Sequence, residues 1–193
     1  MDNLSHNMKV LVMTLSELAF VVPAIPLYIF LVLPNHPEGT LPGILPLIGG
    51  AGVGPSVIAA LGIFVITGIM ACSFYKLFGN THFSSPEMIA MADEFSLRDF
   101  IPIYLAAGIG EEALFRAALL EPCGLIVSSL LFTALHIAYW KKPLMLVYVF
   151  ATGLLFGVLY TFTESLLLCA LVHAAFNTLL TLLLKHRVIV PRG

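Results

Sequence analysis

Three ionisable residues lie close together inside an otherwise apolar run of the sequence. The stretch GEEALFRAALLEP, residues 110–122, contains Glu111, Glu112 and Arg116. An ionised side chain at the centre of a bilayer costs about 3 kcal/mol on insertion scales, so such residues usually face the bundle interior and serve a function. On a helix Glu112 and Arg116 are i,i+4 neighbours, whereas Glu111 points about 140° away from Arg116. We therefore expect Arg116 to neutralise Glu112 and Glu111 to have a different partner.

Two later segments offer polar partners for Glu111 at a similar depth. The segment FTALH contains Phe132 and His136, and the segment HAAFN contains His173 and Asn177. The spacing of His173 and Asn177 places both side chains on one face of a helix. A carboxylate, two imidazoles and an amide in one hydrated cavity can activate water, because a carboxylate removed from bulk water is a stronger base. This combination indicates hydrolytic chemistry inside a membrane.

Each of these residues also has a purely structural explanation. A Glu112–Arg116 pair is more typical of a stabilising contact than of catalysis, and a single histidine or asparagine in a span often only bonds a neighbouring helix. Glu17 and Glu164 have no evident partner, and we expect them to take no part in catalysis. The joint occurrence of the polar residues favours a functional cluster, since a structural bundle has little need to collect them.

The composition is that of an integral membrane protein. Of the 193 residues, 60% are hydrophobic and 10% are charged, whereas soluble domains have about 45–50% apolar and about 25% charged residues. The sequence therefore predicts an all-α polytopic bundle that forms a single transmembrane domain over residues 1–193. Gly153-x3-Gly157 predicts a close contact between two of its helices. With about 20 apolar residues needed per crossing, the candidate spans are 9–33, 54–78, 100–120, 124–140, 143–163 and 165–184.

Residues 84–99 have a different pattern. Apolar residues recur at i, i+3, i+4 and i+7 from Met88, with acidic residues on the other faces. This pattern predicts an amphipathic helix that lies on the membrane surface. Ser96 and Asp99 then predict a capping box at the start of the next span.

The basic residues indicate the orientation and exclude one class of partner. No Lys or Arg falls in the outer loops around 34–53, 121–123 and 164, which predicts cytoplasmic N- and C-termini. The net charge is −2 and no basic cluster resembles a nucleic-acid-binding patch, so we expect no nucleic-acid partner. Apart from Arg116, all basic residues fall on the inner side: Lys9, Lys76, Arg98, Lys141, Lys142, Lys185, Arg187 and Arg192.

The ordered set of polar motifs is similar to that of a known family. It resembles the CPBP family of CAAX-protease and bacteriocin-processing intramembrane endopeptidases, also called the Abi family, which includes the Ras-converting enzyme of eukaryotes. The resemblance covers roughly residues 98–184. The motifs occur in the order Glu111-Glu112-x3-Arg116, Phe132-x3-His136 and His173-x3-Asn177.

The resemblance implies an α-helical intramembrane protease whose water-filled cavity opens toward the inner face and a lateral gap. Carried over by position, Glu111 would be the general base and His136 would help to bind and polarise the water. The other motif residues would stabilise the oxyanion (His173 and Asn177) or support the site (Glu112, Arg116 and Phe132).

A metal-dependent alternative uses the same residues. Glu111, His136 and His173 could together hold a zinc ion as one carboxylate and two histidines. The sequence contains no HExxH motif, and an ion at these residues would leave Asn177 without an evident role. We therefore favour metal-independent glutamate chemistry without a cofactor.

Two functions from other classes use the same polar cluster. One is a polytopic transporter or proton relay, although the two halves of the chain lack the matching interrupted spans of transporter repeats. The other is a catalytically silent membrane regulator. We expect an endopeptidase in a prokaryotic plasma membrane, with the lipid bilayer and a membrane-associated peptide or protein substrate as its partners.

Overall fold

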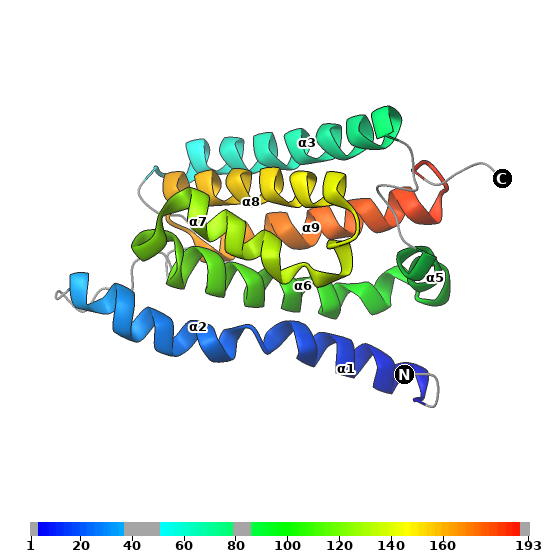
Figure 1. Cartoon of the computed structure of the whole chain (residues 1–193), viewed down its shortest axis with the longest axis horizontal. Coiled ribbons are helices and arrows are strands. Elements are labelled where there is room, and N and C mark those ends of the chain that lie inside the picture. Colours follow the sequence, from blue (N-terminus) through cyan, green and yellow to red (C-terminus); the bar gives the residue numbers. More distant parts are fainter. Residues whose placement is uncertain (1–3, 37–50, 79–85, 190–193) are drawn as a thin grey trace.

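The protein is a bundle of helices that run side by side along one axis (Figure 1). The computed structural model describes residues 4–36, 51–78 and 86–189, and within these ranges it contains helices and no strand. The predicted all-α polytopic bundle is confirmed. Among the described residues, the helical stretches long and apolar enough to cross a membrane are His6–Asn35, Val53–Phe78, Pro143–Thr163 and Leu166–Lys185, and Leu120–Leu135 is a shorter apolar helix.

The first predicted span, 9–33, is interrupted near its middle. Two residues, Ala19 and Phe20, separate helix α1 (His6–Leu18) from α2 (Val21–Leu27). Pro23 has no N–H to donate to the carbonyl of Ala19, and the N–H of Val22 donates to that carbonyl at 3.1 Å instead. The stretch continues as a π-helix, Tyr28–Val32, and a short 3₁₀ helix, Leu33–Asn35.

Three long helices match their predicted spans closely. They are α3 (Val53–Phe78), α8 (Pro143–Thr163) and α9 (Leu166–Lys185). Glu164 has a left-handed backbone conformation (φ 49°) that ends α8. The hydroxyl of Ser165 accepts a hydrogen bond from the Leu168 N–H at 3.2 Å and so caps the start of α9.

The predicted surface helix 84–99 is shorter than expected. Helix α5 (Pro86–Glu94) is seen almost end-on in Figure 1, so it lies across the axis of the long helices, as expected for an interfacial helix. Residues 84–85 lie outside the described ranges. The chain then turns at Ser96, whose N–H and hydroxyl donate to Asp99 Oδ2 at 2.8 Å and 2.7 Å. This contact starts α6 (Leu97–Glu112) as predicted.

The third and fourth predicted spans are irregular at their ends. Helix α6 continues without a break into a π-helical segment, η3 (Ala113–Ala118). Helix α7 (Leu120–Leu135) begins before the predicted residue 124, and Gly124 interrupts it with a positive φ of 78°. It also ends before the predicted residue 140, because His136 leaves the helical conformation ahead of the short 3₁₀ helix Ile137–Tyr139.

Helix α6 lies between α1 and α9 and contacts both through glycine. A Cβ atom on Gly108 would lie 2.4 Å from the carbonyl oxygen of Ala170 in α9. A Cβ atom on Gly110 would lie 2.2 Å from the carbonyl oxygen of Glu17 in α1. Only glycine permits such close backbone contact, so these two positions fix α6 against both neighbours directly before Glu111 and Glu112.

The glycine face of α8 packs on α7. A Cβ atom on Gly153 would lie 3.3 Å from both Ser129 Cβ and Phe132 Cδ1, and one on Gly157 would lie 2.3 Å from Leu125 Cδ1. The close contact predicted from Gly153-x3-Gly157 is therefore confirmed.

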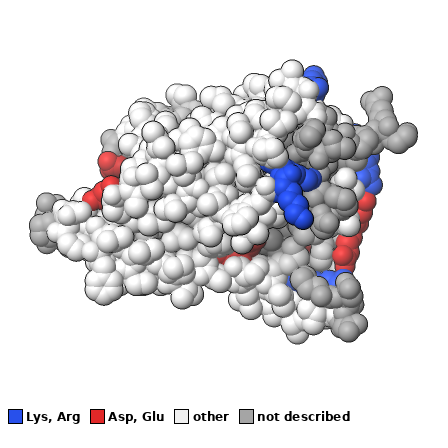
Figure 2. All heavy atoms as spheres, in the orientation of Figure 1, with Lys and Arg blue, Asp and Glu red and all other residues white. Residues whose placement is uncertain are grey.

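Charged side chains join α5 to the rest of the bundle. Lys9 Nζ lies 2.5 Å from Glu94 Oε1, and Arg187 Nη2 lies 2.8 Å from Asp93 Oδ2. Lys185 Nζ donates to the carbonyl oxygen of Phe95 at 2.7 Å. Figure 2 shows Lys and Arg atoms gathered at the end of the molecule where Figure 1 places α5. The asymmetry of the basic residues along the sequence is thus an asymmetry between the two ends of the bundle.

Candidate active site

Glu112 links two polar side chains at the centre of the bundle. Its side chain is 0% exposed, and that of Arg116 one turn later is 2% exposed. Arg116 Nε lies 3.1 Å from Glu112 Oε2, so the predicted ion pair is present. His173 Nδ1 lies 2.8 Å from Glu112 Oε1. This second contact is absent from the sequence-based interpretation, because it depends on how α9 packs against α6.

Arg116 belongs to the π-helical segment, a type of irregularity that is frequent at functional sites. Its Nη2 donates to the carbonyl oxygen of Gly153 at 3.1 Å. Its guanidinium carbon lies 4.7 Å from the centroid of the Phe132 ring and 5.8 Å from that of Phe156. Aromatic faces attract a cation at such distances. The Arg116 guanidinium therefore packs over the face of the Phe132 ring.

His173 is oriented by contacts on three sides. Because an ionised carboxylate only accepts hydrogen bonds, the Nδ1–H of His173 donates to Glu112. The ring stacks on Phe156 with a centroid distance of 5.1 Å. The other nitrogen, Nε2, lies 3.8 Å from Glu111 Oε2. That distance is too long for a direct hydrogen bond, and Glu111 Oε2 has no hydrogen-bond partner among the described residues.

His136 has a defined tautomer when it is neutral. It follows the last residue of α7, and its Nδ1 lies 2.8 Å from the carbonyl oxygen of Phe132. A carbonyl oxygen only accepts, so Nδ1 carries the hydrogen and Nε2 carries the lone pair. The ring lies 4.6 Å from the Phe132 ring and stacks against Tyr139 at 5.9 Å. His136 therefore has Nε2 available as an acceptor.

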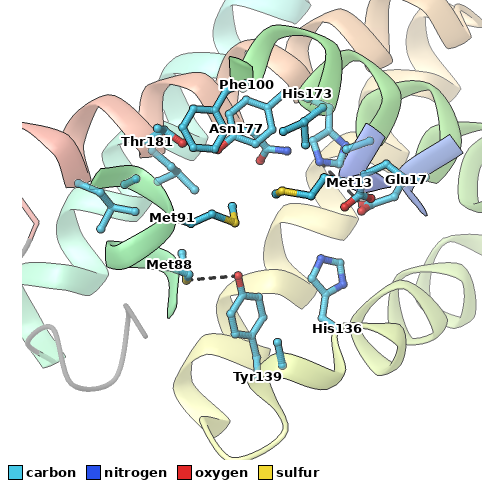
Figure 3. Close-up of a pocket in the computed structure, with 18 of the residues that line it drawn as sticks. Met13, Glu17, Met88, Met91, Phe100, His136, Tyr139, His173, Asn177 and Thr181 are labelled. Carbon is cyan, nitrogen blue, oxygen red and sulfur yellow. Dashed lines mark hydrogen bonds and ion pairs between the residues drawn. The ribbon is translucent and has the colours of Figure 1, made fainter. Parts of the chain in front are cut away.

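The predicted catalytic residues line one cavity of about 390 Å³. Figure 3 shows His173 and Asn177 along one wall, with His136 across the cavity from them. Glu111 also lines this cavity. The structure thus brings together the side chains of three helical segments that the sequence predicts to converge.

One acidic residue of the cavity was missed by the sequence-based interpretation. Glu17 in α1 lines the same cavity as Glu111, His136 and His173, although the sequence shows no partner for it. Its position inside an apolar span was the available signal. Glu164, in contrast, lies at the turn between α8 and α9 and does not line this cavity.

The side chains proposed for zinc do not form a metal site in this arrangement. Within the part of the chain that the structure describes, no three His, Cys, Asp or Glu residues form a group that could hold a metal ion. We therefore derive no chemical step through a metal.

Comparison with known proteins finds similarity in the middle of the chain. The model of the type II CAAX prenyl endopeptidase Rce1-like family matches residues 93–179, which include every motif residue named above. The resemblance inferred from the motifs is confirmed. The uncharacterized protein YpbD of Bacillus subtilis (strain 168) is 36% identical over 78 residues, which are 40% of this chain and 41% of that relative. No solved structure matches the chain significantly.

Proposed function

The model of the type II CAAX prenyl endopeptidase Rce1-like family matches residues 93–179 of this chain, and from this match we propose that the protein is an intramembrane endopeptidase. It hydrolyses a peptide bond of a membrane-associated protein or peptide. The observation that carries the proposal is the shared cavity of Glu111, His136, His173 and Asn177. These residues supply a base, an acceptor for water and donors for developing charge.

Glu111 and His136 activate the water. Glu111 Oε2 is buried and can accept a hydrogen bond, and the Nε2 of neutral His136 is also an acceptor. A water molecule has two hydrogens and can donate one to each. As the water oxygen attacks the carbonyl carbon of the substrate, Glu111 takes up its proton.

His173 and Asn177 stabilise the oxyanion that forms on the substrate. The Glu112 carboxylate accepts from His173 Nδ1 at 2.8 Å, which stabilises the protonated ring and turns Nε2 toward the cavity. Asn177 lies one helical turn further along α9 and adds an amide donor. Donors that face developing negative charge typically contribute about 3–4 kcal/mol each to catalysis.

The proposal is tested by the cleavage of defined substrates in lipid vesicles. Purified wild-type protein is incubated with a set of short single-span peptides and with prenylated CAAX peptides, and the products are identified by mass spectrometry. We expect wild-type protein to cleave at least one substrate. We expect Glu111→Gln to abolish that cleavage without lowering the unfolding temperature, because glutamine keeps the volume and removes the base.

A matched control separates the base from a general charge effect. Glu164→Gln removes an exposed carboxylate that does not line the cavity, so its cleavage rate should equal that of the wild type. Equal rates for wild type and Glu111→Gln would contradict the role of Glu111. Proton transport by a wild-type protein that cleaves no substrate would favour the relay function.

A further inference from the structure

A second carboxylate lies in the cavity of the proposed protease. Of the described residues that line it, Glu17 and Glu111 supply the carboxylates. Glu17 belongs to the last turn of α1, outside the range 93–179 that matches the family. A carboxylate inside an apolar span is energetically unfavourable unless it has a function or a partner, so its presence in the cavity needs an explanation.

The position of Glu17 relative to Glu111 is fixed by backbone contact. The carbonyl oxygen of Glu17 occupies the space where Gly110 would have a side chain, at 2.2 Å from that Cβ position. Gly110 directly precedes Glu111 in α6. The carbonyl of Glu17 also accepts from the Phe20 N–H at 3.4 Å where α1 ends. The crossing of α1 and α6 therefore fixes the backbone of Glu17 beside that of Glu111, and both residues line the same cavity.

The surroundings of Glu17 are the other groups of the proposed site. Its carboxylate interacts electrostatically with Glu111, His173 and His136. Figure 3 shows Glu17 in the same cavity as His173 and as His136 on the opposite wall. Two carboxylates in one cavity repel each other, and a proton retained by the pair removes the repulsion. One carboxylate of such a pair can accept a proton while the other donates one.

Peptide hydrolysis needs both transfers. The water oxygen attacks the carbonyl carbon while Glu111 takes up a proton from the water. This addition forms the tetrahedral oxyanion on the substrate. The C–N bond then breaks, and the leaving nitrogen takes up a proton to depart as an amine. We propose that Glu17 is a catalytic residue that donates this proton to the leaving nitrogen. Glu17 becomes a carboxylate, and the proton held by Glu111 returns to it through the cavity before the next cycle.

This proposal rests on the proposed endopeptidase function. Substrates with different leaving groups distinguish a failure of the Glu17 role from a failure of that function. A peptide that wild-type protein cleaves is compared with an analogue whose scissile amide is an ester of an electron-poor alcohol, which leaves without prior protonation. We expect Glu17→Gln to lower kcat on the amide about 10²-fold, as the loss of a general acid does, and to leave kcat on the ester roughly unchanged. Glu111→Gln should lose activity on both substrates, because both need activated water.

The controls address folding and the position of α1. Ser16→Ala changes an exposed neighbour whose hydroxyl donates to the Met13 carbonyl at 2.7 Å, and it should leave both rates unchanged. If Glu17→Gln unfolds, Glu17→Asp retains the carboxyl group and should slow the amide while sparing the ester. If Glu17→Gln lowers kcat equally on the amide and the ester, or leaves kcat on the amide unchanged, the proposed role of Glu17 is wrong and the endopeptidase function still stands. Wild-type protein that cleaves neither substrate would overturn the proposed function and this role together.

Discussion

At the scale of single residues, Glu112 contacts both Arg116 and His173. The same carboxylate therefore belongs to a buried ion pair and orients a residue of the candidate site. Removing one partner of a buried ion pair leaves the other charge uncompensated, which typically destabilises a protein by about 3–5 kcal/mol. We expect both Glu112→Gln and Arg116→Met to lower the unfolding temperature in detergent, measured by tryptophan fluorescence or calorimetry.

An exposed ion pair provides the control for this prediction. Glu94→Gln removes the contact with Lys9 at the surface, and surface pairs contribute about 0–1 kcal/mol. Its unfolding temperature should stay close to that of the wild type. Unchanged stability of both Glu112→Gln and Arg116→Met would show that the buried pair is not structural.

Asn177 lines the cavity one helical turn from His173. In the proposed mechanism its side-chain amide donates a hydrogen bond to the oxyanion. Loss of one oxyanion donor typically lowers kcat by about 10²–10³-fold, and the effect is confined to the transition state. We expect Asn177→Ala to reduce kcat by this factor with little change in KM, measured by peptide cleavage in vesicles. Thr178→Ala is the neighbouring control, because Thr178 bonds its own helix at Ala174 and does not line the cavity. A raised KM with unchanged kcat would instead make Asn177 a substrate-binding residue.

At the scale of helices, the site depends on two glycines in α6. Gly108 contacts the backbone of α9, which carries His173 and Asn177, and Gly110 contacts the backbone of α1, which carries Glu17. Backbone atoms cannot rotate away as a side chain can. Any added side chain at these positions must therefore displace a helix together with its functional residues.

We expect Gly108→Ala to lower both the unfolding temperature and the cleavage rate, because its Cβ would lie 2.4 Å from the Ala170 carbonyl oxygen. The matched control is Gly62→Ala in α3, where no atom lies within 4 Å of the added Cβ. Alanine is the better helix former by about 1 kcal/mol, so Gly62→Ala should keep or raise stability. Both quantities are measured in the same vesicle preparation. A Gly108→Ala protein as stable and active as the Gly62→Ala protein would rule out a close α6–α9 contact.

At the scale of the whole molecule, the two ends of the bundle differ in charge (Figure 2). Lys142 precedes α8 and Glu164 follows it, so single cysteines at these positions report on opposite ends of one helix. In a background without Cys72, Cys123 and Cys169, we expect the cysteine at Lys142 to react with impermeant maleimide only after the cells are opened. The cysteine at Glu164 should react in intact cells, since the end rich in Lys and Arg stays in the cytoplasm. The reverse labelling pattern would invert the topology.

The sequence by itself determined several features that depend on composition or on neighbours within one helical turn. The apolar composition determined the bundle, the i,i+4 spacing determined the Glu112–Arg116 pair and the shared face of His173 and Asn177, and Ser96 with Asp99 determined where α6 begins. These features are local because the helical repeat alone places the side chains concerned.

Only the tertiary structure decided which helices meet, and at which residues. The contact between Glu112 and His173 and the entry of Glu17 into the cavity join segments far apart in the chain. Their register depends on packing contacts summed along whole helices and on the glycines that permit close approach. No pattern within α1 specifies the residue of α6 that it crosses, so a carboxylate without an evident partner in the sequence lies beside Gly110 and Glu111 in the folded protein.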